Sequence, residues 1–463
     1  MFSNIQKTYP QLPWEIIIVI GVFLFLSLTR VMPLWQGGEA ALGYDTGFYY
    51  VMAKAIDHSG EYFPLDISRE AGMEIIIPLF KLLALIGFSP EAITFTGHLV
   101  AELLLSVALY FFIRQTYNKL AAGSALVIFV ISLVQLEAYS YFLYRNTLSV
   151  FFLFIAWWLI AKKSSLAFWP SLFLTIIHKS TPAIFFPVTF LYLIIKRQWK
   201  LLAVEILALV VGGVYLLTFD STRTILNLLQ TNFAIDTHSI RSGDFLELNT
   251  YLKLAWPYLV LAVGWLFYEL RKKQFSATGL MFLISGTMVV TEFIFYKRLI
   301  IYLDLAAIIL AGVALAYLLS RYAPKHAFAF LFGLLVIGSF VTLPYTTSRP
   351  QLIMPSELDA IKKIDGSTET SAYILNLNSM YAPWLEGWSN RKTISPGLIR
   401  DKWSYENWQI FWANNNLPAQ KKLLAMYDGT PLYLFIGNFS FGFIPSTECF
   451  TRINSNLYRY DCY

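Results

Sequence analysis

The 463-residue chain has little charge and almost no cysteine. Charged residues make up 14% of it and hydrophobic residues 57%, whereas a soluble domain has about 25% charged and about 45–50% apolar residues. This composition excludes an ordinary soluble protein and indicates a chain that crosses a membrane many times. The net charge of +6 does not indicate nucleic-acid binding, because Lys and Arg cluster in short loops between apolar runs.

Common catalytic and cofactor motifs are also missing. The chain has no Gly-rich phosphate loop followed by Lys-Ser/Thr, no His-Glu-x-x-His motif and no cysteine cluster for zinc. These absences leave no certain cofactor; a divalent metal is compatible with the chain, but no pattern indicates one. The only cysteines, Cys449 and Cys462, lie close to the C-terminus. They form one disulfide if that end faces an oxidising compartment and otherwise remain two thiols.

Apolar runs of the length that a membrane-spanning helix needs, roughly 17–25 residues, recur along the chain. The segment 73–88, interrupted by Pro78 and Lys81, is interpreted instead as a juxtamembrane helix on the outer surface. The short runs 165–177 and 181–195 meet at a break near residues 178–182. The eleven predicted spans are 14–34, 93–113, 120–138, 146–161, 165–177, 181–195, 201–219, 254–270, 277–295, 299–320 and 326–344.

Basic residues in alternate loops predict the orientation of these spans. The positive-inside rule places such loops in the cytoplasm, so eleven spans carry the C-terminus to the outside. The outer face then holds the first loop 35–92, the 220–252 loop, the turn at 178–182 and the tail. The basic loops lie at 114–119, 162–163, 196–200, 271–273 and 321–325.

The tail changes character. Strand-like runs at 372–375 and 431–436 alternate with helix-like stretches at 355–364 and 417–427, which is typical of a small α/β domain. The predicted fold class is therefore an α-helical polytopic membrane protein of about 11 spans, residues 1–344, followed by an extracytoplasmic α/β domain, residues 345–463. Several aromatic side chains of this domain either stack on sugars or form its core: Trp384, Trp388, Trp403 and Trp408.

Asp45 lies in a polar loop just after the first span, where it is either a candidate base or a solvated surface acid. Lys179 lies at the break between two short runs, on the predicted outer side, against the positive-inside trend. An ionisable residue at membrane depth is by default a functional hypothesis. The alternative is a lysine that extends its ammonium to the membrane surface.

Further cations lie at the outer ends of predicted spans. Lys297 and Arg298 form a basic pair between two spans, and Arg145 precedes another. Arg suits bidentate contact with phosphate and Lys supplies a point charge, so the set would bind an anionic headgroup. The alternative is that Asp304 pairs with one of these cations in a structural role.

Four short segments between residues 10 and 345 form a pattern in this order. They are Tyr44-Asp45 in the first loop, 78–89 with a Gly-x-Ser end, 174–187 around Lys179, and 298–306. The pattern resembles the GT-C superfamily of integral-membrane glycosyltransferases. Within it, the protein mannosyltransferase and aminoarabinose transferase branch is the most similar. The fold class is therefore GT-C-like.

The resemblance implies a role for each segment. Asp45 matches the family's essential first-loop Asp, Lys179 its lipid-phosphate-binding Lys, and Arg298 the Arg of its Arg-Tyr-x-x-x-x-x-Pro segment. The sequence departs from the family at Asn146, where many members have Asp, and at the missing Pro after Arg298. The Trp-Trp-Asp-Tyr-Gly signature of oligosaccharyltransferase catalytic subunits is absent, which argues against transfer of a whole oligosaccharide.

The function that the resemblance implies is transfer of a sugar from a polyprenyl-phosphate donor to the hydroxyl of a lipid, glycan or protein acceptor. It would occur on the extracytoplasmic face of the plasma (inner) membrane, with inversion. Asp45 would be the general base, and the four outer cations would stabilise the leaving phosphate. The alternatives are a transporter or flippase of lipid-linked saccharides and a saccharide polymerase or ligase. The implied site residues are Asp45 as catalytic; Lys179, Lys297, Arg298 and Arg145 as lipid-phosphate-binding; and Tyr44, Arg69 and His178 as further donor or acceptor contacts.

Overall fold

The computed structural model describes most of the chain. Its residues divide into two compact units. Unit 1 comprises Met1–Gln36, Thr96–Ile235 and Asp244–Arg349, and unit 2 comprises Gly37–Phe95, Asp236–Gly243 and Pro350–Tyr463. The described residues are 13–38, 42–57, 76–217, 245–293, 296–349, 351–396, 402–412, 417–438, 440, 445–446 and 448–462.

The boundary near residue 350 lies close to the predicted domain boundary, but the first loop differs from the expectation. We expected residues 35–92 in the transmembrane module, whereas Gly37–Phe95 groups with the C-terminal unit. The physical reason is close packing between a helix of the first loop and a helix of the C-terminal domain.

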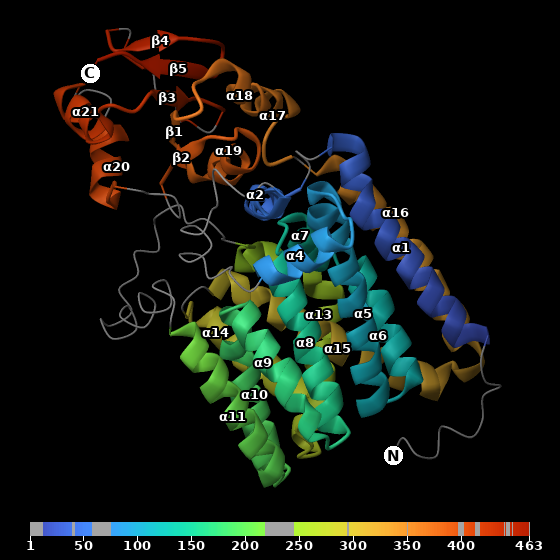
Figure 1. Cartoon of the computed structure of the whole chain (residues 1–463). Coiled ribbons are helices and arrows are strands. Elements are labelled where there is room, and N and C mark those ends of the chain that lie inside the picture. Colours follow the sequence, from blue (N-terminus) through green and yellow to red (C-terminus); the bar gives the residue numbers. More distant parts are fainter. Residues whose placement is uncertain are drawn as a thin grey trace. The chain divides into compact units, whose positions relative to one another are not determined.

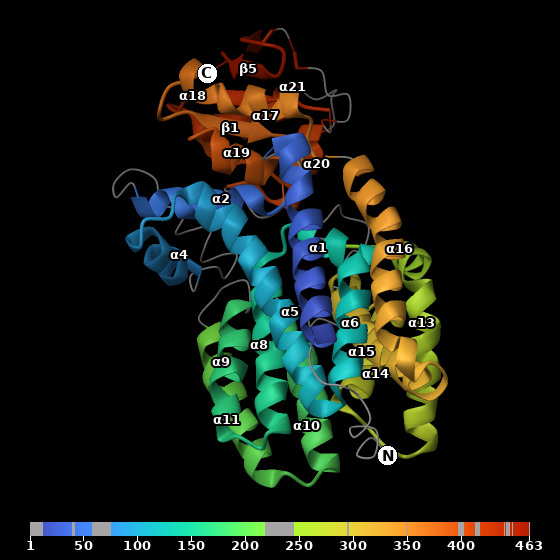
Figure 2. The same cartoon turned by 90° about the vertical axis from the view of Figure 1, so that its right-hand side faces the viewer.

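Unit 1 is a helix bundle in which α8 to α11 run side by side (Figure 1), while α1, α5, α6 and α16 lie together in Figure 2. Short 3₁₀ turns, η4 (Ser165–Ala167) and η5 (Pro324–His326), and the π-helical turn η3 (Ala92–Thr96) precede some of its helices. The α-helices are α1 (Pro13–Gly37), α5 (Gly97–Thr116), α6 (Lys119–Ile131), α7 (Leu133–Ser140), α8 (Tyr144–Ala161), α9 (Phe168–Ile177), α10 (Ser180–Ile195), α11 (Trp199–Leu216), α13 (Leu248–Arg271), α14 (Ala277–Val290), α15 (Tyr296–Tyr322) and α16 (Ala327–Ser348).

Each predicted span coincides with a helix or a helix pair, but the count of eleven is not established. Among the described residues, seven helices are long and apolar enough to cross a membrane. The count rises to eight if α6 and α7, bent by 58°, form one broken span. Helices α9, α10 and α14 are apolar but shorter than a full span.

Helix α15 lies at the centre of the bundle, since the most apolar stretch of this helix is 100% buried. A helix that is hydrophobic on all sides is expected in such a position. It approaches α6 closely at Gly312, where an added Cβ would lie 2.6 Å from the Cα of Ala125. Small residues at such contacts let membrane helices pack backbone to backbone. Helix α6 ends at Ile131, and Ser132 follows it. The Ser132 Oγ accepts a hydrogen bond from the Gln135 N–H at 3.3 Å and so caps α7.

A buried ion pair joins α1 to α5. The Arg30 Nη2 lies 3.3 Å from the Glu102 Oε1, and the two side chains are 0% and 4% exposed. The Arg30 guanidinium also lies 5.6 Å from the centroid of the Tyr139 ring on α7. Tyr139 in turn stacks on His98 of α5, with ring centroids 4.4 Å apart. Three helices therefore meet around one buried cation.

Unit 2 is built on a five-stranded sheet of order β2-β1-β3-β5-β4. Strand β1 pairs in parallel with β2 and β3, while β5 pairs antiparallel with β3 and β4. Strands β1 and β3 coincide with the predicted strand runs. The elements of the C-terminal part are α17 (Pro355–Lys362), α18 (Ile364–Ser367), β1 (Tyr373–Asn376), η6 (Ser379–Tyr381), α19 (Ala382–Trp388), β2 (Lys392–Ile394), α20 (Tyr405–Trp412), α21 (Leu417–Leu424), η7 (Ala425–Tyr427), β3 (Leu432–Phe435), β4 (Phe450–Arg452) and β5 (Leu457–Tyr460).

The tryptophans of this unit form its core. Trp384 and Trp388 belong to one buried apolar cluster, and Trp403 and Trp408 belong to a second. Their rings are at most 6% exposed, so they are not available to stack on a sugar. Next to the second cluster, Cys449 and Cys462 form a disulfide, which decides between the two alternatives left open by the sequence.

Two helices of the first loop belong to unit 2: α2 (Thr46–Asp57) and α4 (Ile76–Leu85). Helix α4 buries Ile76 and Phe80, and exposes Leu82 and Leu85. Its ten residues are too few to cross a membrane. The juxtamembrane position predicted for 73–88 stays a prediction, and residues 73–75 lie outside the described residues.

Candidate active site

Three of the predicted cations gather around one turn of unit 1. Helix α9 ends at Ile177 and α10 begins at Ser180, so His178 and Lys179 form the predicted break. Arg145 and Arg298 each lie in the first turn of a helix, α8 and α15 respectively. The charges of Arg145, Lys179 and Arg298 all act on the buried His178 imidazole. Three cations that lie up to 153 positions apart in the sequence therefore act on one turn.

A hydrogen-bond chain connects the helices that carry these cations. The Tyr302 hydroxyl donates to the Asn146 Oδ1 at 2.7 Å, and lies 2.7 Å from the Thr181 Oγ1. The His178 Nδ1 lies 3.1 Å from the same Thr181 oxygen. Because each hydroxyl has one proton, Thr181 donates to Tyr302 and the His178 Nδ1–H donates to Thr181. The chain fixes α8, α10 and α15 at the break.

Sequence analysis missed Tyr302 and Thr181. Tyr302 follows Arg298 by four residues, which places both on one face of α15. Its hydroxyl lies one helical turn from a candidate cation, within an otherwise apolar run. This pattern could have identified Tyr302 from the sequence. Thr181 carried no such signal, because its role depends on the geometry of the break.

The turn before Arg145 is strained. Phe142 is fully buried and has a φ of 61°, a left-handed conformation that is unusual for a bulky residue. Its ring contacts His98 at 4.4 Å and Tyr144 at 6.3 Å between centroids. Backbone strain of this kind persists where packing holds it and concentrates at functional sites. The turn sets where α8 begins, and with it the position of Arg145.

Two other predicted residues have their own partners. The Lys297 Nζ lies 2.6 Å from the Glu247 Oε1, so its place in the phosphate-binding set stays a prediction with a competing ion pair. Asp304 is fully buried and accepts hydrogen bonds from the Gln135 Nε2 at 2.6 Å, from Ser132 and from Tyr258. These partners of Asp304 are neutral side chains. The alternative in which Asp304 pairs with one of the predicted cations is therefore wrong.

Asp45 lies in unit 2, in the turn that leads into α2. It is partly buried, and its backbone carbonyl accepts a hydrogen bond from the Tyr49 N–H at 3.3 Å. The start of a helix favours a negative charge, because the helix dipole is positive there. The neighbouring Tyr44 is buried and donates its hydroxyl proton to the Ser379 carbonyl at 2.9 Å. Arg69 lies outside the described residues.

The sequence matches no protein-family model and no curated protein. Among solved structures, the apo oligosaccharyltransferase of Archaeoglobus fulgidus is similar with a TM-score of 0.58 at 12% identity, covering 93% of this chain and 70% of that one. The A. fulgidus oligosaccharyltransferase AglB, in complex with an inhibitory peptide and a dolichol-phosphate, has a TM-score of 0.59 at 12% identity and coverages of 91% and 69%.

A third similar structure is apo ArnT from Cupriavidus metallidurans, with a TM-score of 0.58 at 12% identity. Here the similarity covers 96% of this chain and 97% of that chain, so it includes both units. ArnT, an aminoarabinose transferase, and AglB are both GT-C glycosyltransferases. The chain therefore has the fold of the GT-C membrane glycosyltransferases, in agreement with the resemblance found in its sequence.

Proposed function

We propose that the protein transfers a sugar from a polyprenyl-phosphate donor to an acceptor hydroxyl. The observation that carries the proposal is the convergence of Arg145, Lys179 and Arg298 on His178 at the α9–α10 break. Arg and Lys side chains that converge in this way suit a phosphate group, which accepts charge-assisted hydrogen bonds from both. The dolichol-phosphate complex of the similar AglB structure supports a lipid phosphate as that anion.

The chemistry follows from these charges. Arg145, Lys179 and Arg298 bind the phosphate and stabilise the negative charge that it gains as it leaves the anomeric carbon. The hydrogen-bond chain from Asn146 to His178 holds the helix ends in place, so the cations need no rearrangement during the reaction. Asp45 accepts the proton of the acceptor hydroxyl as that oxygen attacks the anomeric carbon. A single displacement inverts the anomeric centre.

The rival functions explain less. A transporter or flippase of lipid-linked saccharides would also bind phosphate through cations. Both similar enzymes are glycosyltransferases, however, and the similarity to ArnT extends over the C-terminal unit, which a flippase does not need. Nothing in the described residues favours a polymerase or ligase over transfer of a single sugar.

The phosphate site is tested by two alanine substitutions. Lys179→Ala and Arg298→Ala are each expected to weaken binding of polyprenyl phosphate by roughly 10–150-fold, because a charge-assisted hydrogen bond contributes about 1.5–3 kcal/mol. The double variant is expected to lose less than the product of both effects, since the two cations share one phosphate. Binding of a polyprenyl phosphate is measured on the purified protein in detergent.

Lys200→Ala is the control for a general loss of positive charge, because Lys200 is exposed at the start of α11 and far from the break in the sequence. Its affinity is expected to equal that of the unmodified protein. Lys297→Ala separates two cases. Weaker affinity for polyprenyl phosphate would mean that Lys297 also binds the phosphate, and unchanged affinity that it only pairs with Glu247. Unchanged affinity in both single variants and the double variant would remove the lipid-phosphate site from the proposal.

The orientation of the chain is a separate prediction. With the N-terminus inside, an odd number of spans carries the C-terminus outside, and an even number leaves it inside. We expect a reporter fused after Tyr463 to behave as extracytoplasmic, because the basic loops alternate along the chain. The reporter is scored for alkaline phosphatase activity, which needs an oxidising compartment, against a fusion in the loop near Lys272 as the cytoplasmic control. Cytoplasmic behaviour after Tyr463 would contradict the outer-face site.

A further inference from the structure

The helix that follows Asp45 packs directly on the C-terminal domain within unit 2. An added Cβ at Gly47 of α2 would lie 1.7 Å from the Pro383 carbonyl oxygen of α19. An added Cβ at Gly387 of α19 would lie 2.8 Å from the Gly47 Cα. The two backbones therefore touch with no side chain between them, at a point two residues after Asp45.

Two tyrosines, one in the turn before α2 and one within it, fix this segment on both sides of the glycine contact. Before it, the buried Tyr44 hydroxyl donates to the Ser379 carbonyl of η6 at 2.9 Å. After it, the Tyr50 ring stacks on Trp388 of α19 with centroids 4.7 Å apart and an angle of 12° between the planes. Tyr50 belongs to the buried apolar cluster of the C-terminal domain. One turn of the first loop is thus part of that domain's core.

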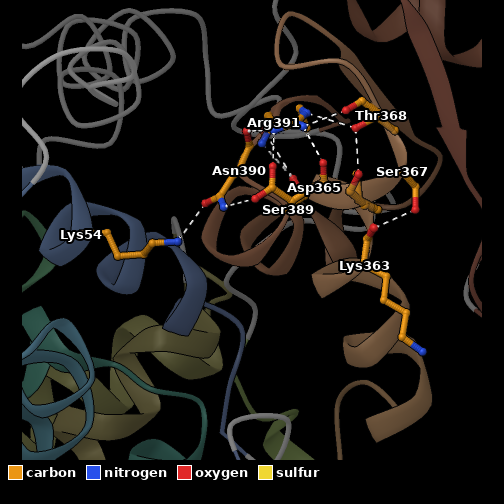
Figure 3. A network of polar contacts seen from close by, with 9 residues as sticks. Lys54, Lys363, Asp365, Ser367, Thr368, Ser389, Asn390 and Arg391 are labelled. Atoms are coloured by element: carbon orange, nitrogen blue, oxygen red, sulfur yellow. Dashed lines mark hydrogen bonds and ion pairs between the residues drawn. The ribbon is translucent and has the colours of Figure 1, made fainter.

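A polar network holds the far end of α2 (Figure 3). The Lys54 Nζ donates to the Asn390 Oδ1 at 2.8 Å, and the Asn390 Nδ2 donates to the Asp365 Oδ2 at 2.8 Å. The other Asp365 oxygen lies 2.6 Å from the Arg391 Nη1. The Asn390 side chain therefore connects the first loop to an ion pair of the C-terminal domain. Asn390 has a φ of 52°, a conformation that Asn adopts more readily than most residues.

The attachment surface is itself rigid. The buried Arg391 uses all five of its N–H donors, on the side chain and carbonyl of Asp365, the side chain and carbonyl of Thr368, and the Asn390 carbonyl. The hydrogen bond from Asn390, and then the Arg391 guanidinium, hold the pKa of the Asp365 carboxyl below its usual range although partial burial opposes them. Asp365 is therefore a carboxylate at neutral pH and a strong acceptor for both neighbours.

We propose that the C-terminal domain positions Asp45, with Gly387 and Asn390 as positioning residues that act on turnover through α2. The proposal rests on the proposed role of Asp45 as the general base. Contacts at the start, middle and end of α2 all come from residues 379–391 of one domain. The orientation of the base is then set by the C-terminal domain.

The test compares glycine substitutions that differ only in available space. Gly387→Ala forces the backbones of α2 and α19 apart, whereas an added Cβ at Gly366 of α18 meets no atom within 4 Å. In the full-length protein, Gly387→Ala is expected to increase hydrogen exchange of the amides of residues 46–54 and to lower kcat roughly 10–100-fold, because misplacement of a reacting group by about 1 Å costs up to about 10²-fold. Gly366→Ala is expected to change neither quantity, and both variants are expected to retain affinity for polyprenyl phosphate.

Asn390→Gly serves as a second, milder variant in case Gly387→Ala does not fold. Glycine accepts the positive φ and removes only the bridging amide, so exchange of the α2 amides is expected to rise and kcat to fall by a smaller factor. In the Asp45→Asn background, Gly387→Ala or Asn390→Gly is expected to lower kcat no further, since both act through the same carboxylate. A general loss of stability would instead lower turnover equally in both backgrounds.

The possible results separate this proposal from the proposed function. Normal turnover in Asp45→Asn overturns the role of the base, and the positioning proposal with it, whatever the exchange data show. Reduced turnover in Asp45→Asn together with unchanged kcat in folded Gly387→Ala and Asn390→Gly overturns positioning alone. Unchanged exchange of the α2 amides in both variants also overturns positioning, because α2 would then not depend on these contacts.

Discussion

Asp45→Asn is expected to lower turnover by at least roughly 10²–10⁴-fold, the range attributed to a general base. Asn keeps the shape and hydrogen-bonding reach of Asp but cannot accept a proton at neutral pH. Affinity for the lipid donor is expected to stay within a few-fold, because the proposed base acts on the acceptor hydroxyl and the proposed phosphate ligands are other residues. A fall in kcat with little change in donor binding indicates an interaction made in the transition state.

Transfer is measured with purified protein and a lipid-linked sugar, under single-turnover conditions, so that product release does not conceal the chemical step. The control is Asp359→Asn, which makes the same chemical change at an exposed position on α17. Turnover of Asp45→Asn equal to that of Asp359→Asn would exclude Asp45 from the mechanism.

The second large effect concerns stability. Arg30→Met is expected to lower the free energy of unfolding by about 3–5 kcal/mol, because it leaves the Glu102 carboxylate buried without its cation. The change also removes the guanidinium from the face of the Tyr139 ring. Stability is measured by denaturant unfolding in detergent, with lipid-phosphate binding as the check that the folded fraction is native.

Two comparisons isolate the buried charge as the cause. The double variant Arg30→Met/Glu102→Leu is expected to recover most of the loss, since no unpaired charge remains in the bundle. Lys119→Met breaks an ion pair with Glu15 in which the lysine is 48% exposed, and is expected to cost less than about 1 kcal/mol. If the double variant is as unstable as Arg30→Met, packing of the arginine, not its charge, explains the effect.

The positions of the helices in unit 1 could be predicted from the apolar runs, because length and hydropathy are local properties of the chain. They did not settle the number of spans, since α9, α10 and α14 are shorter than a full crossing and α6 bends into α7 at Ser132. The break at His178 and Lys179 was predictable, as two polar residues interrupt an apolar run. In the C-terminal unit, β1 and β3 had clear patterns, whereas β2 and β4 have three residues each, too few for a periodic signal.

The sequence predicted single residues of the candidate site but not the contacts between them. Arg145, Lys179 and Arg298 were found because cations are rare at the outer ends of spans, and the charges of all three act on His178. The partners were not predictable: Lys297 pairs with Glu247, and Asp304 is held by Gln135, contacts that depend on tertiary packing. Aromatic composition alone did not distinguish a sugar-binding tryptophan from a core tryptophan, and all four proved to be core.

The packing of α2 on α19 also has a consequence for biogenesis. Helix α2 is synthesised before α19, the helix that it packs against, and 340 positions separate Gly47 from Gly387. At about 5–20 residues per second, the interval between synthesis of Gly47 and Gly387 is on the order of 20–70 s. During that interval the face of α2 that packs on α19, with Tyr50, lacks this native partner. Asp45 can therefore reach its final environment only after α19 has been made, so a nascent chain that lacks α19 would carry the proposed base in an incomplete setting.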